Sequence, residues 1–251
     1  MNDIYAPPES ALETASTVRT PDMGSLQAAI SGTAEIRFME VLASAWDAIQ
    51  GFKFTCNLAL FIYGLISTSL MVLHSLFITD VVDKMGGLLG FLFTQSSQLA
   101  ISAMLSPLWI GIAMLALRHL HGRSATFADV FAPYRRLVAL VLVATFSYLL
   151  ITLGILLLVL PGIYLVFAYL FAPVLVAERG MGVWEAMEIS RKAVTHVWFR
   201  FAGLMVLLGV INMLGVITLG IAWIWTLPWS VMTYAILYNR LFGVSAAVLD
   251  N

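Results

Sequence analysis

The sequence predicts an all-α protein, a polytopic membrane helix bundle of about six transmembrane helices. Of its 251 residues, 61% are hydrophobic and only 11% are charged. Soluble domains have about 45–50% apolar and about 25% charged residues. The excess of apolar residues is therefore typical of a chain whose surface faces lipid. The chain also contains six apolar segments, and most come close to the roughly 20 residues that a membrane-spanning helix needs.

The six expected spans are separated by charged or turn-forming residues. They cover residues 54–78, 96–117, 137–160, 163–177, 201–214 and 218–237. Asp80, Asp83 and Lys84 close the first span, and Pro161 with Gly162 closes the third. Residues 86–95 precede the second span, and the sequence leaves open whether they are re-entrant, interfacial or part of that span.

The predicted membrane domain, residues 34–243, lies between two short tails. Residues 1–33 are rich in Ser, Thr, Pro and Ala and contain no long apolar run. This composition is typical of a mostly disordered segment and not of a secretory signal peptide. Residues 244–251 form the second expected tail. We expect both tails to be cytoplasmic.

The positions of Lys and Arg predict the orientation. With six spans, twelve of the thirteen Lys and Arg residues fall on one side of the membrane, and Lys84 lies alone on the other. Because cytoplasmic loops carry the excess of positive charge, this side is the cytoplasm. We therefore expect a multi-pass protein of the cell inner (cytoplasmic) membrane, with both termini in the cytoplasm.

An amphipathic helix is expected before each pair of spans, at the cytoplasmic surface. The three segments are residues 35–53, 126–137 and 183–197, in which apolar residues recur at helical spacing. Thr126 and Asp129 have the spacing of a helix cap. This pattern favours a threefold repeat of one interfacial helix and one two-span hairpin. The alternative is that amphipathic juxtamembrane helices occur in many unrelated membrane proteins.

Three stretches carry a family resemblance. They read Ile-Leu-Leu-Leu-Val-Leu-Pro-Gly-Ile-Tyr-Leu from 155, Phe-Ala-Pro-Val-Leu-Val-Ala-Glu-Arg-Gly from 171 and Trp-Glu-Ala-Met-Glu-Ile-Ser-Arg-Lys-Ala from 184. Over roughly residues 120–243 the chain resembles bacterial six-span membrane proteins that are similar to the membrane domain of some glycerophosphoryl diester phosphodiesterases. The resemblance implies an inner-membrane location. It does not imply phosphodiesterase activity, because the chemistry of those fused enzymes belongs to a separate soluble domain.

The strongest candidate for a binding site is a group of arginines between the second and third spans. Arg118, Arg123, Arg135 and Arg136 would contact anionic lipid head groups. The alternative is that these cations only set the orientation. The net charge of −1 gives no case for nucleic-acid binding. We predict no catalytic residue, cofactor or metal site, and His119 and His121 point apart if they lie on a helix.

Two amides inside the spans, Asn57 and Asn212, are expected to join helices, since interhelical hydrogen bonds are common in apolar segments. His74 lies near the outer end of the first span, where we expect it to form a hydrogen bond at the membrane interface. The alternative is that His74 senses pH or carries a proton. Glu178, Glu185 and Glu188 with Arg191 and Lys192 read as a solvated, ion-paired helix face.

Three functions follow from these observations. The first is a non-catalytic membrane module that interacts with lipid as a scaffold or regulator. The second is a transporter or channel for small uncharged or lipidic solutes, since many transporters are built from repeats. The third, an enzyme acting on lipids, lacks recognisable catalytic residues. Membrane lipids are the expected partners, and the sequence leaves open both protein partners and self-association.

Overall fold

The computed structural model describes residues 23–34, 36–124 and 126–245, and these residues form helices and no strands. The prediction of an all-α bundle is confirmed. The elements in chain order are α1 (Leu26–Ser31), α2 (Phe38–Ala48), α3 (Lys53–Met85), α4 (Gly87–Leu120), the 3₁₀ helix η2 (Phe127–Arg136), α5 (Leu137–Leu157), α6 (Val159–Ala168), α7 (Ala172–Arg179), α8 (Val183–Ile217) and α9 (Trp223–Phe242).

Five helical segments among the described residues are long and apolar enough to cross a membrane. These segments are Lys53–Met85, Gly87–Leu120, Phe127–Leu157, Val159–Arg179 and Val183–Ile217. The chain is therefore a multi-pass membrane protein. The sixth expected span forms α9, which is helical over 20 residues but is not one of these five segments.

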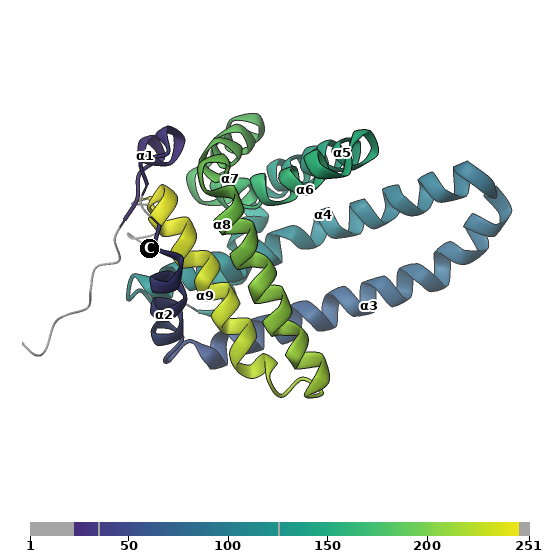
Figure 1. The fold of residues 1–251 in the computed structure, drawn as a ribbon. Coiled ribbons are helices and arrows are strands. Elements are labelled where there is room, and N and C mark those ends of the chain that lie inside the picture. Colours follow the sequence, from purple (N-terminus) through teal and green to yellow (C-terminus); the bar gives the residue numbers. More distant parts are fainter. Residues whose placement is uncertain (1–22, 35, 125, 246–251) are drawn as a thin grey trace, which may run out of the picture.

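The long helices form three hairpins that spread from a common base (Figure 1). The pairs α3/α4, α5/α6 and α8/α9 leave this base in different directions, with α1 beside it. We call the base the hub and define it as α2, α7, the last turns of α4 and the second half of α9. From Val231 to Phe242 every residue of α9 except Arg240 is buried, so α9 is the central helix of the hub.

Aromatic side chains fill the centre of the hub. Phe171, which joins α6 to α7, is fully buried and packs against four other rings. These rings belong to Phe201, Tyr234, Tyr238 and Phe242, with centroids 5.0 to 6.1 Å from that of Phe171. Ring pairs at such distances add to the stabilisation from apolar burial. The cluster fixes α7 and α8 against α9.

Proline positions explain why one span is continuous and another is broken. Pro107 removes a donor inside α4, but Ser106 Oγ donates to the Ala103 carbonyl at 2.8 Å, and the helix continues. Pro173 stands at the start of α7. Its ring prevents α6 from continuing, so the fourth expected span consists of two short helices with a turn between them.

Several predicted boundaries were wrong. Residues 87–95 belong to the single helix α4, which settles the question left open by the sequence. Residues 183–197 do not form a separate interfacial helix, because no Gly or Pro interrupts α8 until Gly203 and the helix runs on into the fifth span. Pro161 does not end the third span but lies in the first turn of α6, where a missing N–H has no cost.

Part of the predicted N-terminal tail is helical. Ser25 accepts a hydrogen bond from the Ala28 amide at the start of α1, and Gly32 ends the helix in the left-handed conformation. Ala29 is buried, and the Gly24 amide donates to the Asn239 carbonyl at 3.0 Å. Residues 1–22 and 246–251 lie outside the described residues, so the rest of both tail predictions stays a prediction.

The other two interfacial segments form short helices that differ in type. Residues 38–48 form α2, whose buried stripe packs on α9. Residues 127–136 form a 3₁₀ helix whose predicted cap is present, since the Thr126 amide donates to Asp129 Oδ2 at 2.8 Å. The three hairpins thus recur as the sequence indicated, but the helices that precede them do not share one form.

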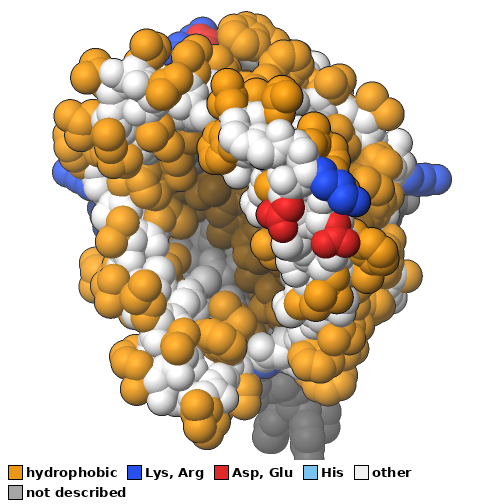
Figure 2. Space-filling view, turned by 90° about the vertical axis from the view of Figure 1, so that its right-hand side faces the viewer, with side chains coloured by type: hydrophobic (Ala, Val, Ile, Leu, Met, Phe, Trp, Pro, Cys, Tyr) orange, Lys and Arg blue, Asp and Glu red, His pale blue; other side chains and the backbone are white. Residues whose placement is uncertain are grey.

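The three hairpins end in turns of different character. Asp80, Asp83 and Lys84 stand beside the α3/α4 turn. The α5/α6 turn has only apolar side chains, and Leu156 and Leu160 are 80% and 78% exposed. Leu219 in the α8/α9 turn is 94% exposed. Figure 2 shows the molecule from the side toward which the α3/α4 hairpin extends in Figure 1. Hydrophobic side chains cover most of this face, which is hollowed in its middle.

Candidate functional site

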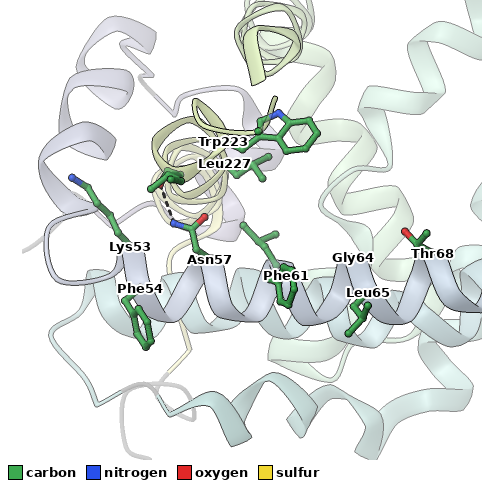
Figure 3. A pocket seen from close by; sticks show the side chains of 12 residues that line it. Lys53, Phe54, Asn57, Phe61, Gly64, Leu65, Thr68, Trp223 and Leu227 are labelled. Atoms are coloured by element: carbon green, nitrogen blue, oxygen red, sulfur yellow. Dashed lines mark hydrogen bonds between the residues drawn. The ribbon is translucent and has the colours of Figure 1, made fainter. Parts of the chain in front are cut away.

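A groove with a volume of about 850 Å³ lies between α3 and the start of α9. It is open along one side, and Figure 3 shows it running along α3 below Trp223 and Leu227. Twelve residues line it: Lys53, Phe54, Asn57, Leu60, Phe61, Gly64, Leu65, Thr68, Gly220, Trp223, Ile224 and Leu227. We call this hollow the α3–α9 groove.

Gly64 and Trp223 give the groove its shape. A side-chain carbon on Gly64 would meet no atom within 4 Å, so the groove is open beside this residue. Trp223 is held in place from the other side. Its indole N–H donates to the Asn212 carbonyl at 2.8 Å, and the ring packs on the bare backbone of Gly215. The roof of the groove is therefore fixed by α8.

A hydrogen bond joins the two helices that form the groove, one turn of α3 from Lys53. Asn57 Nδ2 donates to the Ile224 carbonyl at 2.9 Å. In a regular helix that carbonyl would accept from the amide four residues later, which is Pro228 and has no N–H. Asn57 thus satisfies a carbonyl that α9 leaves free, and it fixes the separation of α3 and α9. The expectation that Asn57 joins helices is confirmed.

Lys53 stands at one end of the groove and is the first residue of α3. Among the lining residues, all of which the structure describes, it alone carries a charge. Its neighbours differ in environment: Phe52 is 1% exposed and stacks on His119, whereas Phe54 is 80% exposed. The groove therefore joins a cation at its mouth to an apolar channel along α3.

The structure separates the four arginines predicted to contact lipid. Arg118 pairs with Asp129 at 2.7 Å, and its side chain is only 13% exposed. Arg123, Arg135 and Arg136 are exposed. Arg135 and Arg136 end η2 while Asp129 stands in its first turn, so they lie roughly 12–14 Å along the helix from the Arg118 pair. Arg118 thus has a structural partner, and the four do not form one cluster.

Two further polar side chains inside the spans join helices: Asn212, as predicted, and His74. His74 Nε2 lies 2.8 Å from Ser97 Oγ and connects α3 to α4. Asn212 Nδ2 donates to Ser230 Oγ at 2.8 Å and connects α8 to α9. His119 and His121 have separate partners, since His121 Nε2 lies 3.2 Å from Asn239 Oδ1 while His119 stacks on Phe52.

The predicted charged helix face is only partly correct. Glu188 pairs with Arg191 at 2.8 Å and Lys192 at 3.4 Å on the surface of α8, as expected. Glu178 does not belong to this face, because its side chain is fully buried in the hub beside Tyr238 and Arg179. The sequence could not reveal this difference, because it did not show that Glu178 lies on a separate helix. Glu178 belongs to α7, whereas the other four residues belong to α8.

The sequence did not predict the α3–α9 groove. It depends on a contact between residues 167 positions apart, which no local pattern reports. Two signals were present in the sequence: a lone amide, Asn57, in one apolar segment and a proline, Pro228, in another. Together they predict that one segment supplies the donor that the other lacks.

No family model, no curated protein and no solved structure matches the chain. The resemblance described from the sequence therefore stays a prediction.

Proposed function

We propose that the protein is a non-catalytic membrane module that binds one membrane lipid in the α3–α9 groove. The observation that carries this proposal is an open groove of about 850 Å³ with a mainly apolar lining. Ligand sites in proteins have volumes of about 300–1,000 Å³ and are lined mostly by hydrophobic and aromatic side chains. A lipid chain is the ligand that a membrane supplies in quantity.

The surroundings of the groove support a ligand that comes from the bilayer. Phe54, Phe61 and Leu65 lie on α3 at the groove and are 80%, 69% and 58% exposed. Exposed apolar side chains of a membrane helix face lipid chains. A lipid in the groove would thus remain next to the bulk bilayer.

Transport of solutes is the second candidate, and it draws support from the three similar hairpins. Transporter sites are usually formed by broken helices that turn polar groups toward the substrate. In the α3–α9 groove, Asn57 is already engaged with Ile224, and most other lining side chains are apolar. The groove therefore favours lipid binding over transport of a polar solute.

We further propose that the protein lies in the inner membrane with the hub toward the cytoplasm. Lys and Arg residues gather at the hub, where Arg118 pairs with Asp129, Arg179 donates to the Phe242 carbonyl and Arg240 pairs with Glu40. The positive-inside rule supports this orientation. The family resemblance supports the choice of membrane.

Native mass spectrometry after gentle delipidation tests lipid binding. The wild type should retain one lipid molecule, and Gly64→Leu should lose it, because the new side chain would occupy the floor of the groove. Gly209→Leu is the matched control, since this exposed glycine of α8 also has nothing within 4 Å of an added side-chain carbon. Equal lipid retention by Gly64→Leu and wild type would refute the proposal.

A further inference from the structure

We infer that the lipid in the α3–α9 groove is an anionic glycerophospholipid, with its phosphate at Lys53 and one acyl chain along α3 toward Thr68. This inference rests on the proposed function and names the class of ligand. It commits to a lipid as the source of the phosphate, because the cation stands at the mouth of an apolar channel.

The charge at the mouth of the groove favours an anion. In the described part of the chain, no carboxylate forms an ion pair with Lys53. Lys53 is also the first residue of α3, and the preceding residue, Phe52, makes no side-chain cap hydrogen bond. The unpaired N–H groups of a helix N-terminus attract negative charge. Lys53 and the start of α3 therefore act together on a phosphate.

The length of the groove matches an acyl chain. Lys53 and Thr68 stand at its two ends along α3 (Figure 3). Fifteen residues of helix rise by about 22 Å, and one leaflet contributes roughly 15 Å to the hydrocarbon core. A whole acyl chain thus fits between the cation and Thr68. Gly64, nearly three quarters of the way from Lys53 to Thr68, leaves room where a large side chain would narrow the path.

The same features argue against other occupants. An apolar helix of a second copy would fill the channel but bring no anion to Lys53. A free phosphate would meet Lys53 but leave the channel empty. A lipid with net negative charge satisfies both ends of the groove, and a neutral head group satisfies the cation less well, because its own ammonium group opposes Lys53.

The test offers the delipidated protein equal amounts of phosphatidylglycerol and phosphatidylcholine with identical chains, and counts retained lipids by native mass spectrometry. The wild type should prefer phosphatidylglycerol. Lys53→Gln should reduce that preference about fivefold, the effect of one juxtamembrane cation, while total lipid retention stays close to that of the wild type. Lys84→Gln is the matched control, because Lys84 lies at the far end of α3.

The two proposals fail in different ways. If Gly64→Leu keeps both lipids, the groove is not a lipid site and the proposed function is wrong. If Gly64→Leu loses the lipid but Lys53→Gln keeps the preference for phosphatidylglycerol, the groove binds lipid and the anionic assignment is wrong. A wild type that retains both lipids equally would also overturn the assignment. An unchanged melting temperature in each variant shows that folding is intact.

Discussion

Glu178 and Tyr238 meet inside the hub although they lie 60 positions apart in the chain. The phenol of Tyr238 donates to Glu178 Oε2 at 2.7 Å, and both side chains are buried. The other carboxylate oxygen accepts from the Ser245 amide, and Arg179 forms an ion pair with Oε2 at 3.1 Å. Arg179 also donates to the Phe242 carbonyl at the end of α9. This network ties α7 to the last turn of α9.

Substitutions in this network should destabilise the protein. Tyr238→Phe should lower the free energy of unfolding by about 1–3 kcal/mol, because a buried charged acceptor loses its donor. Glu178→Ala should cost about 3 kcal/mol, the lower end of the range for breaking a buried pair, since it leaves a partly buried Arg179 without its charge partner. Unfolding in detergent, followed by circular dichroism, measures both. Glu185→Ala, on the exposed face of α8, is the control and should change stability little; an equal loss there would contradict the argument.

The hydrogen bond between Asn57 and Ile224 should contribute more to the free energy of unfolding when residue 228 is proline than when it is alanine. Asn57→Leu should destabilise the protein by about 0.5–1.5 kcal/mol, the range of interhelical hydrogen bonds in membranes. In a Pro228→Ala background the new amide can reach the Ile224 carbonyl, so Asn57→Leu should cost less. The measurement is a double-mutant cycle of unfolding free energies.

The control for this cycle is Ser97→Ala, which removes the bond between Ser97 and His74 in the α3/α4 hairpin. Its cost should be the same with proline or alanine at position 228. If Asn57→Leu behaves like Ser97→Ala, Asn57 does not compensate for the proline.

The arginines predicted from the sequence should divide into two groups. Arg118→Gln should lower stability by about 1–2 kcal/mol, because Arg118 pairs with Asp129 and is mostly shielded from solvent. Arg135→Gln/Arg136→Gln should leave stability unchanged and reduce the enrichment of anionic lipids around the protein severalfold. Thermal unfolding and lipid exchange into nanodiscs separate the two effects. Loss of lipid enrichment in Arg118→Gln at unchanged stability would reverse the assignment.

Reporter fusions test the orientation. A fusion at the C-terminus should report the cytoplasm, and a fusion within residues 80–85 should report the opposite side. The reason is that Lys84 is the only Lys or Arg predicted on the far side of the membrane. A C-terminal fusion that reports the periplasm would overturn the proposed orientation.

The sequence predicted those parts of the fold that depend on local apolar runs. The class, the three hairpins and the Thr126–Asp129 cap followed from composition and spacing. The boundaries at Pro161 and Val197 were wrong because a proline fits the first turn of a helix and nothing in the sequence ends α8 there. Helix α1 was missed because its stability comes from packing against α8 and α9, which no local pattern reports.

The candidate site was harder to predict than the fold. The group of arginines near Arg118 predicted a lipid site in one loop, but Arg118 forms an ion pair with Asp129. Nothing in the sequence alone distinguishes Lys53 as a ligand contact. Its place at a groove depends on where α9 crosses α3, and the bond from Asn57 to the Ile224 carbonyl, 167 positions away, holds this crossing.

The open side of the α3–α9 groove determines what controls its occupancy. Phe54, Phe61 and Leu65 border that side and are exposed to the bilayer. A lipid bound as we propose would therefore enter by lateral diffusion within one leaflet, without crossing water. The degree of occupancy would then follow the mole fraction of that lipid in the leaflet and not its aqueous solubility.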